Sequence, residues 1–433
     1  MRIQILIITL FIQKIFTFTF DEEIITFKEN WISFKNFNHE ISATGGGNNE
    51  FQQYFLDPET SRLVNNTLQI YPRFIEADLR DDLDLYQKGC TNNWNNGCFS
   101  KGSMHWQHGS IHYENNIPIP VGGLRSKPFK SAKLISKESF GYGKLTINFK
   151  LPKGNFLWPA IWMLPTTNYI WPIGGEIDII ESMGNSPNSG YGLNYNSVSS
   201  ALHFGYNKSL YPIAFTPFAE KVQKISYDRK NLKEWNKVSL YRSKYNIIIT
   251  LNGNEIFNCD KMFKAAAQQL PDNTIFKKEI IDKGYLAGFR KYSIMMGENL
   301  PDFLWKDLPY DAPFHENFNL IINTAIGGNF FGDSMNSDKN LVKPPWNDIS
   351  KGKLPSVQFL ERIEEWFNWS DEKPIFEKNN IETLDWKSCI KDSVPCDANK
   401  KLYLDSEKHL SFKKPKIGDK TAFHIGKITF EPY

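Results

Sequence analysis

The chain has few cysteines for its length, and those it has form no metal-binding pattern. Only five occur among 433 residues. Cys90 and Cys98 flank one short loop, and Cys389 and Cys396 flank another, spacings that suit two local disulfides. Neither pair has zinc-ligand spacing with a second pair or with clustered histidines, which argues against a zinc site. Cys259 is left over and is expected to be a buried thiol, although other pairings remain open.

Several further features are missing from the sequence. It has no internal repeat and no long low-complexity tract, which argues against a repeat architecture. The net charge of +3 is spread along the chain and no basic stretch is interleaved with aromatic residues, so nucleic-acid binding has no footprint here. Helical patterning is sparse and limited to short pieces near residues 262–269 and 357–366. Beyond the N-terminus, no segment is long and apolar enough to span a bilayer.

The N-terminus is typical of a secretion signal. A basic start at Arg2 is followed by an apolar run that continues to Phe20 and is interrupted at Lys14. This predicts a signal peptide over residues 1–20 and a single domain over residues 21–433. A signal anchor is the alternative, because no small-residue cleavage site is evident. We expect a secreted, extracellular glycoprotein, since glycosylation sequons occur at Asn65, Asn207 and Asn368.

The rest of the chain is dominated by short strands separated by turns. Residues 139–151 and 237–251 alternate apolar and polar side chains, and Asn252-Gly253 suits a hairpin turn. Residues 318–325 form a continuous apolar run that ends at a pair of glycines. Many antiparallel strands with glycine-rich turns predict an all-β protein, a β-sandwich of jelly-roll type. The length suits one large β domain with insertions.

The most informative segment is Glu-Ile-Asp-Ile-Ile-Glu at residues 176–181, which places three carboxylates in an otherwise apolar strand. Side chains alternate along a strand, so Glu176 and Asp178 share one face while Ile177 points into the core. Strict alternation would turn Glu181 to the opposite face. One extra residue, a β-bulge at Ile179-Ile180, would return Glu181 to the face of the other two acids.

Three acids on one face predict hydrolytic chemistry. Like charges cannot all ionise cheaply, so at least one pKa is expected to rise. Paired carboxylates with separated pKa values are typical of glycoside hydrolases, and a retaining enzyme needs its two carboxyl groups about 5 to 5.5 Å apart. The alternative is the polar outer face of an exposed strand. Trp171 and Gly174-Gly175 before the strand weigh against that alternative, because an aromatic platform beside acids suits a sugar ring.

These residues, together with other motifs, resemble glycoside hydrolase family 16, most closely the endo-β-1,3-glucanases (laminarinases) and the β-1,3-glucan-binding proteins. The loop between the first two cysteines resembles the one in the glucan-binding branch. The resemblance runs over about residues 25–370 and resumes near residues 422–432. The matching motifs lie at residues 45–54, 140–144, 157–165, 171–181, 202–205 and 320–329.

The resemblance implies a concanavalin A-like jelly roll with an open cleft on its concave face, and retaining hydrolysis. By match to the family's Glu-x-Asp-x-x-Glu pattern, Glu176 would be the nucleophile and Glu181 the general acid and then base. Asp178 would be the electrostatic helper between them. The bulged form of this pattern is shared by laminarinases and some agarases and carrageenases, whereas enzymes that cleave mixed-linkage glucan resemble an unbulged strand. Among enzymes with the bulged form, the loop between Cys90 and Cys98 and the Gly-Gly-Gly-Asn segment at residues 45–48 favour β-1,3-glucan.

Three tryptophans are candidate platforms for sugar rings. Of these we rank Trp171 first. Packing in the sandwich core is an equal alternative for Trp158 and the favoured one for Trp162. His203 matches a position that the family places in the cleft, with an ordinary core histidine as the alternative.

Two loops are further candidates for sugar contacts. Asn48 and Glu50 follow a triple-glycine loop that we expect to line the non-reducing side of the cleft. Asn329, after Gly327-Gly328, is expected to hydrogen-bond sugar hydroxyls on the other side.

Two functions remain open at the level of sequence. The first is a secreted endo-β-1,3-glucanase, and the second is a glucan recognition protein that binds without cleaving. The chain keeps all three acids, whereas binding-only relatives typically lose one or both glutamates, so the enzyme is favoured. We expect a monomer whose partner is a β-1,3-glucan polysaccharide, with no cofactor and no catalytic metal. A structural Ca²⁺ occurs in many family members, and the sequence alone shows no ligand cluster that decides for or against one here. Residues of about 370–420 are expected to form a surface insertion.

Overall fold

The computed structural model describes about half of the chain. It covers most of residues 34–75, 84–100, 106–123, 127–167, 171–204, 234–268, 308–331 and 419–433, with the short strands β1 (Phe16–Phe18), β19 (Phe376–Lys378) and β20 (Leu410–Phe412) and a few residues between 272 and 282. Several predictions lie outside the described residues. These are the predicted pair Cys389 and Cys396, the sequons at Asn207 and Asn368, the helix at 357–366, and most of the signal peptide and of the 370–420 insertion.

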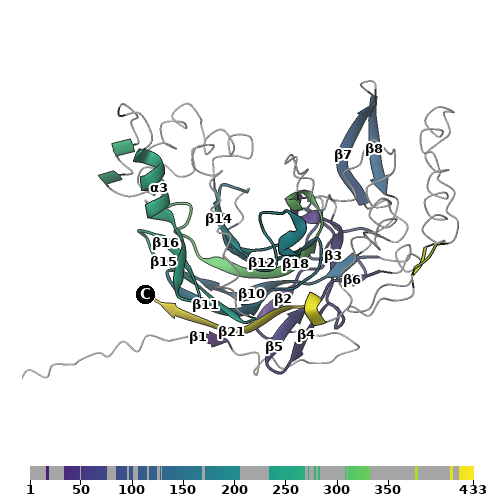
Figure 1. Cartoon of the computed structure of the whole chain (residues 1–433), viewed down its shortest axis with the longest axis horizontal. Helices are drawn as coiled ribbons and strands as arrows, with labels where there is room; N and C mark the ends of the chain where they lie inside the picture. The colour runs from purple at the N-terminus through teal and green to yellow at the C-terminus, as the bar shows by residue number, and fades with distance from the viewer. Residues whose placement is uncertain are drawn as a thin grey trace, which may run out of the picture.

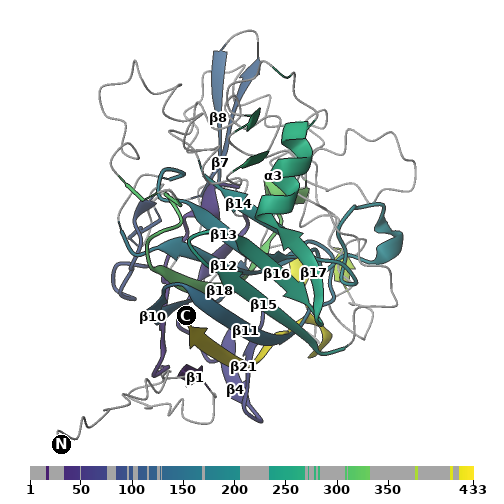
Figure 2. The ribbon, with the colours of Figure 1, turned by 90° about the vertical axis from the view of Figure 1, so that its left-hand side faces the viewer.

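The described residues form two antiparallel sheets packed face to face (Figures 1 and 2). The six-stranded sheet has the order β14 (Ser199–His203), β13 (Glu176–Glu181), β12 (Leu157–Pro165), β18 (Phe318–Ile326), β10 (Lys133–Phe140), β2 (Phe37–His39). The eight-stranded sheet has the order β17 (Asn254–Asn258), β16 (Ile247–Leu251), β15 (Asn236–Arg242), β11 (Gly143–Lys150), β21 (Phe423–Pro432), β5 (Thr67–Ile70), β4 (Ser61–Val64), and β1 also pairs with β21.

Smaller elements decorate this sandwich. The helix α3 (Cys259–Gln268) matches the short helical pattern expected there. Strand β1, which pairs Phe16 with Phe430 of β21, is formed by residues near the end of the predicted signal peptide. No helix among the described residues has the length and apolarity to cross a membrane. The remaining strands are β3 (Gln52–Tyr54), β9 (Phe129–Ser131) and β6 (Arg73–Phe74) in one small sheet, and β7 (Trp106–Glu114) and β8 (Ile117–Gly123) in a hairpin.

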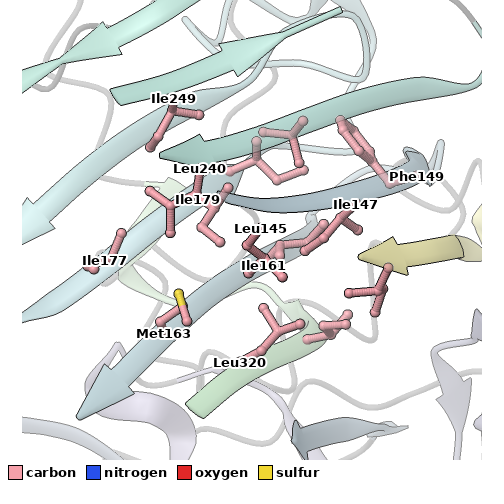
Figure 3. Packing of buried hydrophobic residues seen from close by; sticks show 14 of the residues in the cluster. Leu145, Ile147, Phe149, Ile161, Met163, Ile177, Ile179, Leu240, Ile249 and Leu320 are labelled. Atoms are coloured by element: carbon pink, nitrogen blue, oxygen red, sulfur yellow. The ribbon is translucent and has the colours of Figure 1, made fainter. Parts of the chain in front are cut away.

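The core lies between the two large sheets. Alternation along β11 turns Leu145, Ile147 and Phe149 toward the other sheet, where they meet the inward side chains of β12 and β13 (Figure 3). Ile161 and Met163 of β12 face this same layer. The predicted all-β sandwich is confirmed. The faces of the two sheets that point away from this core carry the polar side chains of the strands.

The bulge in β13 is confirmed by its register with both neighbours. Ile180 pairs with Ile161 and Asp178 with Trp162, two consecutive residues on β12, so Ile179 is the additional residue on β13. Ile177, Ile179 and Ile180 are all fully buried in the core. Both isoleucines of the bulge therefore point inward, and the next residue, Glu181, points outward with the other acids.

The predicted disulfide between Cys90 and Cys98 is present, with a Cα–Cα distance of 5.8 Å. The loop that it closes rests on a small separate cluster that includes Leu85 and Phe99. Cys259 is a buried free thiol, as expected.

The bulge makes a stability prediction. Ile179→Ala and Ile180→Ala should each lower the free energy of unfolding by about 2–4 kcal/mol, because each removes a fully buried side chain. The half-exposed Ile248 of β16 is the matched control, and Ile248→Ala should cost less than about 1 kcal/mol. Urea denaturation measures all three. In a regular strand Ile180 would lie beside the acids, so a small cost at Ile180 with a large one at Ile179 would contradict the bulge.

Candidate active site

Strand register brings the predicted residues together on the outer face of the six-stranded sheet. Directly paired residues in antiparallel strands share a face. Glu176 pairs with His203 of β14, Asp178 with Trp162 of β12, and Glu181 with Ala160. Glu176 and Glu181 are partly exposed, while Asp178 between them is only 3 % exposed.

Asp178 is the centre of a short polar relay. Its Oδ2 lies 2.8 Å from His203 Nε2, and its carboxyl group also hydrogen-bonds Glu176. Asp178 is thus hydrogen-bonded to one of the two glutamates that flank it. His203 lies on the acid face, so the alternative of an ordinary core histidine is wrong. These two hydrogen bonds, the Asp178 relay, join the central acid to His203 and Glu176 and restrict the side chains of both.

Each glutamate also receives a hydrogen bond from an indole. Trp171 Nε1 donates to Glu176 Oε2 at 3.0 Å, and Trp158 Nε1 donates to Glu181 Oε1 at 3.0 Å. Such bonds orient a carboxylate and stabilise its ionised form. The Trp158 ring is itself held by a parallel stack on Phe330, with centroids 3.9 Å apart. Both acids are therefore oriented by indole donors, and the donor to Glu181 is itself held by a ring stack.

Burial changes the charge state of the acids. Removal from water, followed by repulsion from Asp178, raises the pKa of Glu176 from its ordinary 4.5 to about 8. Burial also raises the pKa of Asp178 and of Glu181, and the neighbouring carboxylates add to the rise at Glu181. The indole hydrogen bonds act in the opposite direction on Glu176 and on Glu181. The cluster therefore keeps at least one proton near neutral pH.

Of the three aromatic candidates, Trp171 is placed as predicted, whereas Trp158 and Trp162 are not. Trp171 is 39 % exposed and its ring lies 6.1 Å from that of His203, which suits a platform beside the acids. Trp158 is only 9 % exposed, and Phe330 covers one face of its ring, so it serves as a donor to Glu181 rather than as a platform. The preferred core position for Trp162 is wrong, because it lies on the acid face and is partly exposed.

The two predicted asparagine loops lie next to each other, not on opposite sides of the acids. The backbone N–H of Asn329 donates to the carbonyl of Asn48 at 2.7 Å. Gly328 permits this approach, since a Cβ there would lie 2.4 Å from that same carbonyl oxygen. Glu50 is buried beneath the glycine loop and hydrogen-bonds Gln52, so it is a structural residue rather than a sugar contact.

The glycine turn before β13 packs against Phe314, a residue that the sequence motifs do not point to. Phe314 packs against Gly175, where a Cβ would come within 2.9 Å of its ring, and stacks edge-on with Phe204. Gly175 and Phe204 adjoin the paired residues Glu176 and His203. The carbonyl of Phe314 accepts from the buried Arg242 at 2.8 Å. No local sequence pattern links these positions, because the contacts join segments far apart in the chain.

The same face offers donors for a cation. Ligand atoms of Glu176, Asp178 and His203 all lie within 4.8 Å of one another. These atoms already hydrogen-bond each other through Asp178, which is the connectivity expected of an acid–base cluster.

Comparison with known proteins identifies relatives of this site. A family model described as the XgeA-like catalytic GH16 domain matches residues 113–203, which include the acid strand. A β-1,3-glucan-binding protein of Penaeus monodon is 28 % identical over 362 residues, covering 78 % of this chain and 82 % of its own length. A glucan endo-1,3-beta-glucosidase of Cryptopygus antarcticus is 27 % identical over 209 residues, covering 48 % and 58 % respectively. The laminarinase catalytic domain of Thermotoga maritima is 20 % identical with a TM-score of 0.39, covering 73 % of this chain and 88 % of its own.

The raised pKa of Glu176 predicts a pH-dependent cost to stability. Because this pKa is about 8 in the fold against an ordinary 4.5, the unfolded chain releases the proton first, and stability falls as pH rises between these values. Glu176→Gln should therefore match the wild type near pH 4 and exceed its free energy of unfolding by about 2 kcal/mol at pH 8. This is less than half of the ~4.8 kcal/mol that the full shift would give, because Glu176 is partly exposed and solvent screens its charge. Chemical denaturation at both pH values measures this. The exposed Glu138→Gln is the control, and equal stability of Glu176→Gln and wild type at pH 8 would contradict the argument.

Proposed function

We propose that this chain, which belongs to glycoside hydrolase family 16, is a secreted endo-glucanase that hydrolyses β-1,3-glucan with retention of configuration. The observation that carries the proposal is the pair of indole-held glutamates flanking Asp178 on one sheet face. Two carboxyl groups of different role, one ionised and one protonated, are what a retaining glycosidase requires.

The proposed reaction has two steps. In the first, Glu176 attacks the anomeric carbon while Glu181 gives its proton to the glycosidic oxygen, so the C–O bond breaks and a glycosyl ester forms on Glu176. In the second, Glu181 takes a proton from water, whose oxygen attacks the same carbon and releases Glu176. Two inversions restore the original configuration, and both glutamates return to their starting states.

The relay through Asp178 supports this division of roles. Glu176 must be a carboxylate to attack, and one proton is shared between it and Asp178. A proton that resides on Asp178 leaves the charge on Glu176, where the Trp171 N–H stabilises it. Glu181 accepts a hydrogen bond from the Trp158 indole instead, and its raised pKa keeps it protonated for the first step. Formation of the ester removes the charge of Glu176 and lowers the pKa of Glu181, which then acts as base.

Relatives of both kinds support a β-1,3-glucan ligand. The curated proteins that this chain is similar to include a glucan-binding protein and a glucan endo-1,3-beta-glucosidase. The bulged acid strand favours the β-1,3 linkage. The second candidate function is recognition of this glucan without cleavage, which the binding-protein relative favours because its match covers more of the chain.

Secretion is part of the proposal. The apolar N-terminus and the disulfide between Cys90 and Cys98 support it, since disulfides persist in oxidising compartments. The exposed Asn65 stands at the tip of the β4–β5 hairpin, a position open to glycosylation on an exported chain.

The first test of the proposal uses the two glutamates. Glu176→Gln and Glu181→Gln should each reduce laminarin hydrolysis at least about 100-fold, because each removes a group that reacts in one step. Reducing-sugar release measures this, with lichenan and agarose as competing substrates. Glu431→Gln on β21 is the control. Laminarin binding without reducing-sugar release by the wild type would establish the recognition protein instead.

The indole on the general acid predicts a change in pH dependence. Trp158→Phe keeps an aromatic ring against Phe330 but removes the N–H donor, so the pKa of Glu181 should rise further. The alkaline limb of kcat/KM should then move to higher pH by about one unit. Trp162→Phe is the matched control, because its indole donates to Asn323 rather than to an acid. Equal shifts in both variants would show that Trp158 acts on packing alone.

A further inference from the structure

The side chain of Arg242 is buried against the segment that leads into β18. It ends β15, is only 2 % exposed and is the largest fully buried side chain of the described residues. Its Nη1 donates to the carbonyl of Phe314 at 2.8 Å and to that of Glu316 at 2.7 Å. Its Nη2 donates to the carbonyl of Phe140, the last residue of β10. One guanidinium thus joins the segment before β18 to the end of β10.

A buried cation costs stability unless its donors are paired. Burial lowers the pKa of Arg242 to about 10, which leaves the guanidinium charged at neutral pH. The carboxylate of Asp311 acts in the opposite direction on this pKa, and it accepts a hydrogen bond from the hydroxyl of Tyr142. In the described part of the chain, Arg242 hydrogen-bonds main-chain carbonyls rather than a carboxylate. These bonds fix the course of the main chain around residues 314–316.

The ring of Phe314 connects this fixed segment to the acid site. A Cβ on Gly175 would lie 2.9 Å from that ring, so the ring packs directly on the turn before β13. The ring also meets Phe204 edge-on, with centroids 5.2 Å apart. Gly175 directly precedes Glu176, and Phe204 directly follows His203, the residue that pairs with Glu176. Phe314 therefore supports both strands beside this pair.

The turn that Phe314 supports also carries the indole donor of the nucleophile. The backbone N–H of Gly175 donates to the carbonyl of Pro172 at 3.0 Å, which closes the turn next to Trp171. Trp171 in turn donates to Glu176. A Cβ on Gly175 would also lie 3.1 Å from Pro313, so the turn has no room to move toward the fixed segment. The place of this segment thus limits where the turn can lie.

These contacts form one path from a buried cation to the acid strand. We propose that Arg242 is a positioning residue for Glu176, which it serves by holding the Phe314 ring against the turn before β13. It contacts neither the acids nor a sugar, and acts through Phe314 alone. This role rests on the hydrolysis of the proposed function.

The proposed role is specific to one end of the acid strand. Glu176 begins β13 and Glu181 ends it. Glu181 is oriented by Trp158, whereas Phe314 packs on the turn at the start of the strand. Loss of the Arg242 bonds should therefore disturb the nucleophile and spare the general acid.

Kinetics of Arg242→Met in the full chain test this role. The variant keeps a long side chain but loses all donors, and kcat for laminarin should fall about tenfold because the nucleophile is misplaced. The acidic limb of kcat/KM should move to lower pH by about half a unit, since burial is the largest cause of the raised pKa of Glu176 and a looser turn admits water. Asp178 on β13 and His203 on β14, which also act on this pKa, are unchanged in the variant. The alkaline limb, set by Glu181, should stay in place.

Val238→Ala is the matched control. Val238 is fully buried on the same strand as Arg242 and pairs with Ile147 and Leu251. The substitution should lower stability and leave kcat and both limbs of the pH profile unchanged. Equal changes in both variants would show that Arg242 only stabilises the fold, and would overturn the positioning role.

Hydrogen exchange gives a readout that does not depend on hydrolysis. In Arg242→Met the amides of residues 173–176 and 202–204 should exchange at least about tenfold faster than in the wild type, with no change near Glu181. Val238→Ala should not single out these residues. If Arg242→Met does not fold, Arg242→Lys replaces it. Lysine keeps the charge but donates from a single nitrogen, so it should show the same changes to a smaller extent.

The outcomes separate this role from the proposed function. Wild-type kcat, pH limbs and exchange in a folded Arg242 variant would overturn the positioning role and leave hydrolysis intact. Exchange that rises evenly across both sheets would overturn it as well. Absence of laminarin hydrolysis by the wild type would overturn the proposed function, and exchange at the turn before β13 would still decide whether Arg242 positions Glu176.

Discussion

The extra residue in β13 is the constraint on which the site depends. Without it, strict alternation would send Glu181 into the layer of Ile161 and Met163 and leave an isoleucine beside Asp178. With Ile179 and Ile180 both in the core, the strand keeps its apolar contacts and still presents three acids on the outer face. The bulge thus meets two demands at once, which explains why two isoleucines stand in succession between the second and third acids.

The three buried acids lower the stability of the fold, and hydrogen bonds from neighbouring side chains partly offset this loss. Burial raises the pKa of all three, and repulsion from nearby carboxylates adds to the rise at Glu176 and Glu181. The offset comes from Trp171, Trp158 and His203, each of which hydrogen-bonds a different acid. These hydrogen bonds do not cancel the rise in pKa, so the acid cluster keeps a proton near neutral pH. The same imbalance that weakens the fold at alkaline pH is what allows a carboxyl group to act as an acid near neutrality.

Local patterns predicted much of this structure and failed where distant segments meet. The strand periods, the Asn252-Gly253 turn, the Cys90–Cys98 disulfide and the bulge are local features, and the structure has each of them. The sequence leaves Trp158 open between a sugar platform and a core position, because its neighbours in the chain do not reveal that Phe330 covers one face of its ring. Asn48 and Asn329 were placed on opposite sides, since two glycine loops give no sign of their mutual contact. Contacts across hundreds of residues are set by the sheet order, which no single segment encodes.

The choice between cleavage and recognition follows from the same physics. A protein that only binds glucan needs aromatic platforms and hydrogen-bonding groups, and the exposed Trp171 suits such a platform without any need for buried acids. Buried carboxylates with raised pKa values would lower its stability and add nothing to its affinity for a neutral polymer. This chain keeps all three and holds each with its own donor. Groups that destabilise a fold and are nonetheless positioned this closely are typical of sites that move protons, which supports the proposed hydrolysis over recognition alone.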